Sequence, residues 1–536
     1  MTVEEANGDR GLAWGALEAG VSVVTGYPGS PGTGIFEVLA EAADRYGHAA
    51  EWCLNEKIAL DVAAGASQGG RRAIVCMKSV GINVALDTLM VLNMTGVHGG
   101  LVILMGDDPG AWGSQNEQDT RPLGPLSELP MLEPSTPLEG RRMVRWAFDL
   151  SEELRTVVII RITRSFCAHR QAQDPPPAPD ERPSMAPDRE PGRWISSLSN
   201  TVPNHRRLHQ TLEEVRTRFE AAPFSEVHGS GRLGLLAGGF AATKLSEALA
   251  GADASALTVL RLGTLYPLPG ERIGRFLEGC DEVVVFEEVD PYLEDAIKAI
   301  GYDRGTTPRI RGKRSGDVNW EGELFRWHIQ AALDAHLPGF EPSRRYTEAD
   351  WAQEKPYRVS HCAGCPYARI LTVLREEANA LGLNPFLAAD PGCVVVAADQ
   401  LDTKLCMGSS LGVARGLELA GVPERPVAII GDSSFYHSSI NALIHARTTG
   451  AHLLLVVLDN GGAMTTGGQG TPDRAPSADA GPVAGIRDLA AACGVSSIWT
   501  VDDEDAEPQM RSTFRKALGD GGLGMLLVRK SCRPAG

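Results

Sequence analysis

The stretch from Gly431 to Gln469 constrains the fold of this chain more than any other part of the sequence. An apolar run directly precedes it (427–430, VAII), and it contains a second apolar run (453–458, LLLVVL). Between the two runs, residues 438–448 have the composition of a helix. Strand, loop, helix and strand in this order form one parallel crossover unit. The sequence therefore predicts an α/β protein built on parallel sheets.

Polar residues follow both predicted strands directly. Asp432 comes after the first strand, and Asp459 and Asn460 come at the end of the second. Both ends point to the carboxyl edge of the sheet, where open α/β sheets bind ligands. Acidic and amide oxygens suit a hard cation such as Mg²⁺, which takes further ligands from a phosphate. An acidic helix cap and a glycine-rich turn are the alternative, but two such residues after two buried strands favour a cation and diphosphate site. Nearby glycines let backbone approach a diphosphate closely: Gly431, Gly461, Gly462, Gly467 and Gly468.

Composition limits the classes of function that the chain can have. Its 536 residues leave room for about three domains. The formal net charge of −17 argues against binding to nucleic acid or to an anionic membrane surface. No apolar run reaches the length of about 18 residues that spans a membrane, and the N-terminus has no secretion signal. We expect a cytoplasmic protein, in which clustered cysteines indicate metal rather than disulfides.

Four cysteines form a pattern of this kind. Cys362 and Cys365 make a C-x2-C pair, which alone could be redox-active, metal-binding or incidental. Cys393 lies farther along in the sequence DPGC, and Cys532 follows the last predicted strand. Four thiolates fit either a zinc ion or a [4Fe–4S] cluster.

The N-terminal region repeats the pattern of a strand followed by a glycine-rich turn. Residues 21–27 (VSVVTGY) read as a strand and lead into PGSPGTG, which by itself is an ordinary turn before a helix. Glu56 lies in a predicted helix, where a solvated surface residue is the simplest interpretation. Residues 114–121 (SQNEQDTR) read as a polar loop after another buried strand, and such loops often carry function.

Several of these segments together resemble one family. GDSSF…LDN is similar to the thiamine diphosphate motif, with Ser433 in place of its last glycine, and LDNGGAMTTGGQ resembles the matching segment of the 2-oxoacid:ferredoxin oxidoreductases. YPGSPGT followed by EWCLNEKIALDVAAGAS looks like the pyrimidine-binding domain of the same family. The similarity is greatest to the large subunit of indolepyruvate:ferredoxin oxidoreductase. We expect this chain to lack the ferredoxin-like C-terminal extension of those subunits.

The resemblance implies roles for individual residues. Mg²⁺ ligands would be Asp432, Asn460 and the carbonyl of Gly462. Glu56 would contact the aminopyrimidine ring, where a carboxyl group favours the tautomer that takes up the C2 proton. Catalytic groups would be Glu56, His437, Ser30 and Thr465. Cofactor contacts would come from Tyr27, Gly29, Gly431, Asp432, Ser433, Asn460, Gly462, Thr466 and Gly467. The ligands of a [4Fe–4S] cluster would be Cys362, Cys365, Cys393 and Cys532. In the polar loop, Gln115 stands where relatives carry a basic residue for the substrate carboxylate, and Arg121 is a possible substitute.

The same resemblance implies a domain order. Residues 1–170 would form the pyrimidine-binding domain and 171–202 a Pro-rich linker. Residues 203–340 would form a domain like the C-terminal domain of transketolase, and 341–536 the pyrophosphate and Mg²⁺ domain with the cysteines. The predicted fold class is α/β, a thiamine diphosphate-binding fold with parallel sheets flanked by helices.

The implied activity is the oxidative decarboxylation of a 2-oxoacid, an arylpyruvate such as indolepyruvate. Thiamine diphosphate, Mg²⁺ and a [4Fe–4S] cluster would be the cofactors, with ferredoxin as electron acceptor and coenzyme A as acyl acceptor. The expected partner is a separate small (beta) subunit, in a dimer of heterodimers. A thiamine diphosphate-dependent decarboxylase or carboligase without redox chemistry is the alternative, and a subunit that keeps only the fold is a third possibility.

Overall fold

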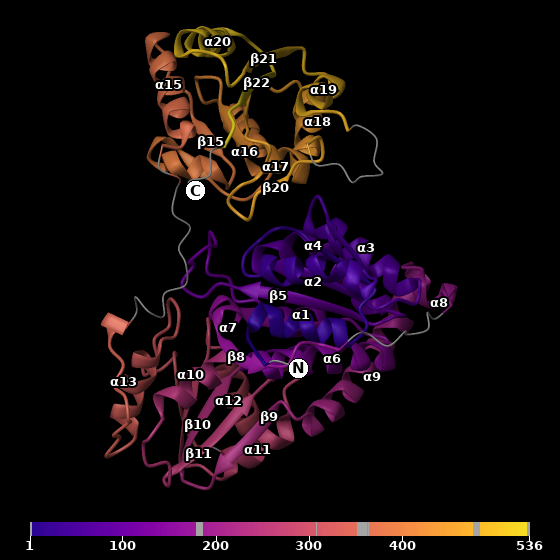
Figure 1. Ribbon diagram of the computed structural model, residues 1–536, viewed down its shortest axis with the longest axis vertical. Coiled ribbons are helices and arrows are strands. Elements are labelled where there is room, and N and C mark those ends of the chain that lie inside the picture. The colour runs from indigo at the N-terminus through magenta and orange to yellow at the C-terminus, as the bar shows by residue number, and fades with distance from the viewer. Residues whose placement is uncertain are drawn as a thin grey trace. The chain divides into compact units, whose positions relative to one another are not determined.

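The computed structural model describes residues 3–177, 186–306, 308–350, 362, 364–474 and 483–532. The chain divides into two compact units, Met1–Arg358 and Val359–Gly536. We describe each unit by itself. Figure 1 shows both in chain order, from indigo to yellow.

A seven-stranded sheet forms the centre of the first unit. All neighbouring strands in it are parallel except β12 and β6, which pair antiparallel. Its strands, in spatial order, are β12 (Thr264–Tyr266), β6 (Met131–Leu132), β7 (Val158–Thr163), β5 (Leu101–Asp107), β4 (Ala73–Lys78), β2 (Val23–Gly26) and β3 (Ala49–Trp52). The central strands are buried on both faces, as their continuous apolar sequences require.

Helices cover both faces of this sheet. On one face, α1 (Gly8–Glu18), α2 (Thr33–Tyr46) and α6 (Pro137–Leu154) pack with alternate strand residues in one apolar core. On the other face, α3 (Glu56–Gln68) and α4 (Ser79–Thr95) form a second core with the intervening strand residues. The short helices α5 (Leu123–Ser127) and α7 (Arg164–Ala168) follow β5 and β7 in the chain.

A second sheet in the first unit has five strands. Its order is β14 (Arg309–Arg311), β13 (Glu282–Phe286), β10 (Leu233–Gly238), β11 (Leu257–Leu262) and β9 (Ser225–Gly229), and only β9 is antiparallel. Residues of α11 (Gly270–Glu278) and α12 (Tyr292–Arg304) share a core with one face. Those of α10 (Phe240–Ala248) and α13 (Arg326–His336) pack on the other. These elements are drawn in magenta and orange in Figure 1.

The segment between the two sheets contains regular structure. β8 (Arg170–Gln173) pairs antiparallel with β1 (Glu4–Asn7) near the N-terminus. After residues 178–185, which lie outside the described part, come α8 (Pro191–Trp194) and the long helix α9 (Leu198–Ala221). A single 3-10 turn, η1 (Glu348–Asp350), ends the described part of the first unit. None of the helices within the described ranges is long and apolar enough to cross a membrane.

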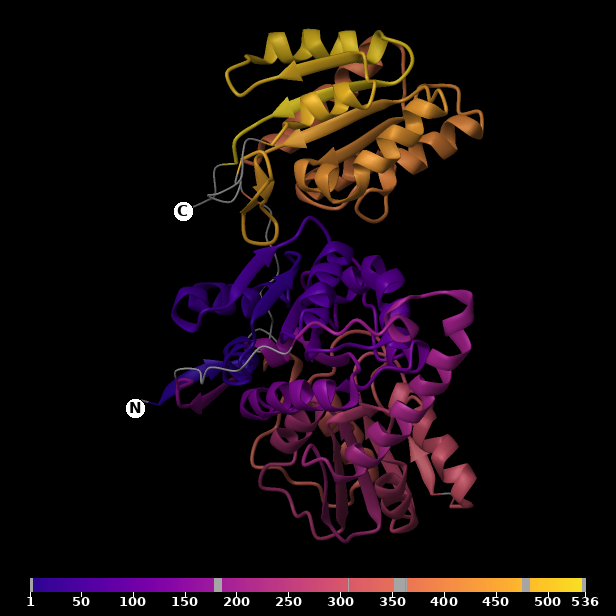
Figure 2. The same cartoon turned by 90° about the vertical axis from the view of Figure 1, so that its right-hand side faces the viewer.

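The second unit is built on one six-stranded parallel sheet. Its order is β16 (Thr403–Lys404), β15 (Leu387–Ala389), β17 (Val427–Gly431), β18 (Leu454–Asp459), β22 (Gly524–Arg529) and β21 (Ser497–Val501). One core joins the sheet to α15 (Pro366–Ala380), η2 (Cys393–Gln400) and α20 (Glu507–Gly519). The other core joins it to α16 (Ser409–Leu419), α18 (Ile440–Thr448) and α19 (Ile486–Ala492). Figure 2 shows helices on both sides of these strands.

The crossover from β17 to β18 differs in one respect from the prediction. We expected a loop after the first strand, but a helix begins at once, as α17 (Asp432–Ser434), the π-helical turn η3 (Phe435–Ser439) and α18. The backbone N–H of Ser433 donates to the Asp432 side chain at 2.6 Å, and Phe435 is fully buried. The polar sequence DSS therefore lies in the first turns of a helix that the buried Phe435 anchors to the core. The prediction of an α/β fold with parallel sheets is confirmed.

Candidate functional site

One edge of the six-stranded sheet gathers residues from four neighbouring strands. Cys393, Asp432, Asn460 and Cys532 follow β15, β17, β18 and β22, which are adjacent and parallel. The carboxyl ends of parallel strands lie at one edge, so the topology brings a thiol, a carboxylate, an amide and a second thiol into one row.

Asp432 is the most strongly held of these groups. Its Oδ1 accepts the Ser433 N–H, and its Oδ2 accepts the backbone N–H groups of Asn460, Gly461 and Gly462 at 3.2, 2.7 and 2.8 Å. The side chain is 3 % exposed, and burial raises its pKa to about 6. One carboxylate therefore fixes the turn after β18 to the end of β17.

The amide of Asn460 shows what this edge can bind. Its side-chain oxygen faces only two acceptors, Asp432 Oδ2 and the Gly462 carbonyl oxygen. If the amide were turned over, its nitrogen would donate to them at 3.3 and 2.9 Å. Oxygen ligands of an octahedral Mg²⁺, each about 2.1 Å from the ion, lie about 3 Å apart. The side chains of Asp432 and Asn460 and the Gly462 carbonyl therefore lie close together at this edge.

The four predicted cluster cysteines belong to the same region. Asn460 Nδ2 lies 3.7 Å from Cys393 Sγ. Cys365 caps α15, and its N–H donates to the Cys362 carbonyl at 3.1 Å. Burial raises the pKa of Cys393 to about 11, and the nearby thiols of Cys365 and Cys532 add to the shift. Burial also raises the pKa of Cys532, with Cys362 and Cys365 contributing. The thiols are therefore close enough that each raises the pKa of its neighbours. A bound metal would lower these pKa values instead.

The spacing of these thiols can be compared with that of a zinc site. Sulfur ligands of a tetrahedral zinc, with bonds of about 2.3 Å, lie about 3.8 Å apart. Among the residues that the structure describes, no three of these sulfur atoms lie within 4.8 Å of one another. The arrangement is therefore wider than a zinc site with three or four of these thiolates requires.

The remaining predicted residues of the second unit lie around this edge. His437 occupies the π-helical turn η3, a feature often found at functional sites; it is 5 % exposed, and its Nδ1 lies 3.0 Å from Ser438 Oγ. Thr465, Thr466 and Gly467 lie in the hairpin between β19 (Gly462–Ala463) and β20 (Gln469–Gly470). Thr465 is exposed, whereas Thr466 Oγ1 donates to the Ala463 carbonyl at 3.1 Å.

In the first unit, the turn after β2 carries Tyr27, Gly29 and Ser30 at the carboxyl edge of the seven-stranded sheet. The Gly29 N–H donates to Thr33 Oγ1 at 2.8 Å. A Cβ on Gly29 would lie 2.8 Å from Lys78 Cδ, so the lysine side chain runs along this glycine. Lys78, at the end of β4, was not predicted; its position at a strand end was the available signal.

Glu56 lies at the same edge, after β3. It is the first residue of α3, behind the cap Asn55, whose side chain accepts the Ile58 N–H at 2.9 Å. Glu56 is 5 % exposed, which excludes the interpretation as a solvated surface residue. A Cβ on Gly81, in the first turn of α4, would lie 2.6 Å from both Cγ and Oε1 of Glu56. The carboxyl group therefore packs closely against the first turn of α4 at Gly81, which has no side chain.

Arg121 does not serve as the substrate-binding cation that the sequence suggested. It is 1 % exposed and pairs with Asp119 and Glu287, each at 2.6 Å. Arg161 and Lys244 continue the buried network with further carboxylates, namely Asp107, Glu133, Glu288 and Glu323. The network ties residues 107–121 to the end of β13, whereas Gln115 remains exposed. Apart from Asp119, the partners lie far apart in the chain, so the spacing of charges along the sequence did not reveal these pairs.

A further residue that the sequence analysis missed stands beside the cysteines. Tyr367, in the first turn of α15, is 2 % exposed, and its hydroxyl has no hydrogen-bond partner among the described residues. Burial raises its pKa, and the charges of Asp432 and Cys393 add to the shift. Its position two residues after Cys365 was the available signal.

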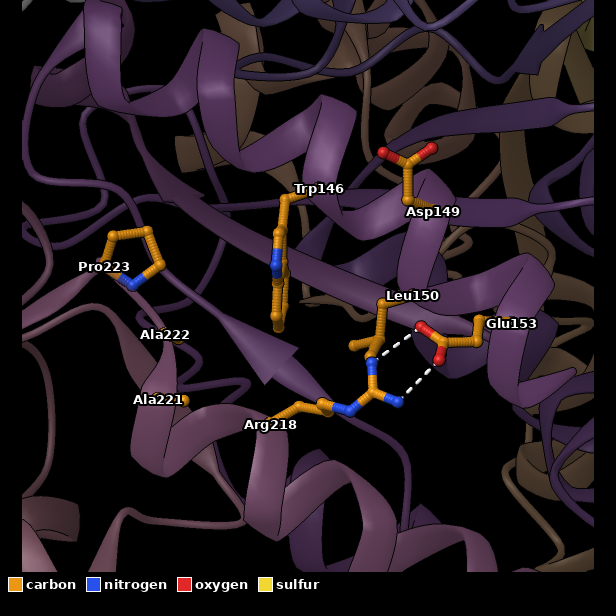
Figure 3. Close-up of a pocket in the computed structure, with 8 residues that line it drawn as sticks. All are labelled: Trp146, Asp149, Leu150, Glu153, Arg218, Ala221, Ala222 and Pro223. Atoms are coloured by element: carbon orange, nitrogen blue, oxygen red, sulfur yellow. Dashed lines mark hydrogen bonds and ion pairs between the residues drawn. The ribbon is translucent and has the colours of Figure 1, made fainter.

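A separate hollow of about 180 Å³ lies between α6 and the end of α9. Figure 3 shows the indole of Trp146 on one side and the ion pair of Arg218 with Glu153 on the other. None of the predicted site residues lines it.

Comparisons with known proteins agree with this geometry. Residues 14–223 match the family "Pyruvate flavodoxin/ferredoxin oxidoreductase, thiamine diP-bdg", and residues 397–528 match "Thiamine pyrophosphate enzyme, C-terminal TPP binding domain". Indolepyruvate oxidoreductase subunit IorA of Pyrococcus abyssi is 32% identical over 98% of this chain and 85% of its own length. The same subunit of Methanothermobacter marburgensis is 33% identical, over 98% and 86%. Sulfopyruvate decarboxylase subunit beta of Methanococcus maripaludis is 28% identical over 23% of this chain and 60% of its own length.

These matches, with the two parallel sheets and their polar edges, define a thiamine diphosphate-dependent oxidoreductase of the 2-oxoacid class. Within that class, the chain belongs to the family of indolepyruvate oxidoreductase IorA subunits.

Proposed function

We propose that this chain is the cofactor-binding subunit of an enzyme that oxidatively decarboxylates an arylpyruvate such as indolepyruvate. The balanced reaction takes the 2-oxoacid, coenzyme A and two oxidised ferredoxins to acyl-CoA, CO₂, a proton and two reduced ferredoxins. The observation that carries the proposal is the contact of Cys393 with Asn460. It supports the proposal because one of the four thiols lies beside a residue that we assign to the cation, where an electron acceptor would be needed.

The donor atoms support particular ligands. Asp432, Asn460 and the Gly462 carbonyl offer the hard oxygens that Mg²⁺ prefers, and Cys362, Cys365, Cys393 and Cys532 offer four thiolates for a [4Fe–4S] cluster. Bound thiamine diphosphate supplies an electron sink for the decarboxylation. We assign the diphosphate contacts of the second unit to Gly431, Ser433, Thr466 and Gly467.

The chain's own side chains would orient the cofactor and handle protons. Glu56, buried and packed against Gly81, would hold and exchange a proton at the aminopyrimidine ring. Tyr27 and Gly29 would line the ring on the first unit. Ser30, His437 and Thr465 would face the reacting end, where they would position the substrate carbonyl. The polar loop supplies no free arginine for the substrate carboxylate, since Arg121 is fully paired.

The relatives support the substrate and the partners. Six of them carry the name indolepyruvate oxidoreductase subunit IorA, and the word subunit implies a second chain. We infer a small subunit that completes the active site, in a dimer of heterodimers, with ferredoxin as electron acceptor.

A decarboxylase or carboligase without redox chemistry is the second candidate. One observation favours it: part of the chain matches a sulfopyruvate decarboxylase subunit. Such an enzyme would keep Glu56, Asp432 and Asn460 but would not need the four cysteines. Its product would be an aldehyde or a ketol, released without reduction of an acceptor.

The decisive experiment measures iron, sulfide and thiamine diphosphate in protein purified without oxygen. We expect about four irons per chain and a visible band that dithionite bleaches. Cys393→Ser should lower the iron content strongly, whereas Cys493→Ser, a change in another partly buried cysteine of the same unit, should leave it unchanged. Bound thiamine diphosphate with no iron would instead establish the enzyme without redox chemistry.

A further inference from the structure

A second group of metal-binding side chains lies in the first unit, in a part of the sequence that the proposed function does not use. Among the described residues, Glu128, His205 and His209 bring three ligand atoms within 4.8 Å of one another. The Nε2 atoms of His205 and His209 lie 3.2 and 3.0 Å from the two carboxylate oxygens of Glu128. Donor atoms about 2.1 Å from a tetrahedral ion lie about 3.4 Å apart.

The two histidines share one face of a rigid helix. They stand four residues apart on α9, so their side chains project in the same direction, and their ring centroids are 4.3 Å apart. Leu208 and Leu212, which adjoin the histidines along the helix, are buried and anchor it to the protein. The imidazoles therefore stand on a fixed support.

The carboxylate is held in place at a conformational cost. Glu128 follows α5 with a φ of 54°, in the left-handed region, where glycine or asparagine is usual after a helix. The Ser127 carbonyl before it accepts the side-chain N–H of the buried Asn93 at 2.9 Å. A strained backbone that aims a side chain at two histidines points to a use for that side chain.

We propose that Glu128, His205 and His209 bind a divalent d-block cation of the Zn²⁺ class. Two imidazoles and a carboxylate suit zinc, cobalt or nickel, whereas magnesium and calcium prefer oxygen ligands alone. The side chains are 26 % (Glu128), 44 % (His205) and 56 % (His209) exposed, so water can complete the coordination. The ion would join α9 to the end of α5. In the chain, α5 directly follows Arg121 and its buried ion pairs. The ion would thereby stabilise the loop of residues 107–121.

The test is a titration of the purified complex with Co²⁺, followed by visible spectroscopy. Co²⁺ at the proposed site should give ligand-field bands without the thiolate charge-transfer band that marks binding to cysteine. The double variant H205A/H209A should lose this signal and about one equivalent of Co²⁺. His228→Ala is the matched control, because His228 is an exposed histidine whose one ion pair within the described residues is with Glu226. This variant should keep both the signal and the bound Co²⁺.

A second variant separates metal binding from folding. Glu128→Gly removes the carboxylate and relieves the left-handed backbone, so the variant should fold. We expect Zn²⁺ to raise the Tm of the wild-type complex and of H228A, but not of E128G or H205A/H209A. Equal Co²⁺ stoichiometry and equal Tm shifts in all four proteins would overturn the proposal, as would cobalt spectra with thiolate bands alone. The group would then consist of histidine–carboxylate ion pairs only.

Discussion

The two units each bring a buried carboxylate to the carboxyl edge of a parallel sheet, but they hold it in different ways. Four backbone N–H groups converge on Asp432. Glu56 is placed by packing, with its stem and one oxygen against the bare backbone of Gly81. The backbone N–H groups stabilise the anionic form, which can hold a cation, against the burial that raises its pKa to about 6. We propose that the carboxyl group packed against Gly81 serves proton exchange at the cofactor ring, whereas the one held by backbone N–H groups anchors the cofactor.

The largest effect should follow from replacing Asp432. Asp432→Ala removes the acceptor of four backbone N–H groups and the charged ligand of the cation. We expect the affinity for Mg²⁺ and thiamine diphosphate to fall about 100-fold or more, the usual cost of truncating a buried, hydrogen-bonded charge. Isothermal titration with the cofactor measures this change.

Asp488→Ala, at an exposed acid in the first turn of α19, is the control and should bind as the wild type does. Retention of full affinity by D432A would mean that the backbone-held carboxylate is structural only.

Glu56→Gln should separate activation from anchoring. The amide keeps the size of the side chain but cannot exchange a proton, so the affinity for cofactor should change little. We expect kcat to fall about 10²- to 10⁴-fold, the typical contribution of a general acid–base group. Steady-state turnover with saturating cofactor is the measurement. If E56Q instead bound the cofactor weakly but kept its turnover per bound cofactor, Glu56 would anchor the cofactor rather than activate it. The proposed difference between Glu56 and Asp432 would then be wrong.

Gly81→Ala tests how far the contact with Gly81 sets the position of Glu56. The new methyl group would lie 2.6 Å from two atoms of that side chain, so the carboxyl group has to move. A displacement of about 1 Å in an active site can cost up to about 10² in rate, and we expect a smaller loss than in E56Q. Gly65→Ala, on the same helix as Glu56 but with open space around the added carbon, should be neutral in kcat. Equal rates for both variants would show that Glu56 is held by other contacts.

The sequence predicted some features of the fold and of the candidate site but not others. The placement of Asp432, Asn460, Cys393 and Cys532 at one edge was predictable because each follows an apolar strand, and parallel topology carries such ends to one edge. The helix start at Asp432 was missed because the polar sequence DSS is typical of a loop and carries no local helix signal. The pairing of Arg121 with Glu287 was also missed, since a charge 166 positions away gives no local signal. Long-range ion pairs depend on the packing of two sheets, which periodicity does not encode.

The smallest effect concerns a third carboxylate, Asp9, which shows that a raised pKa alone does not mark a cofactor site. Burial raises its pKa to about 6, as it does for Asp432, but Asp9 Oδ1 has no hydrogen-bond partner among the described residues.

A protein loses stability when an acid with a raised pKa in the folded state ionises. The loss grows as the pH rises from the unfolded pKa, near 4, to about 6, and it is constant above that range. Asp9→Asn cannot ionise, so its stability relative to wild type should increase across this window by up to about 3 kcal/mol. Unfolding transitions recorded between pH 4 and pH 7 test this, with the exposed Asp44→Asn as a control that should show no such trend. If the difference in unfolding free energy between D9N and wild type did not change with pH, Asp9 would ionise in the folded protein without cost. Its pKa would then not be raised as that of Asp432 is.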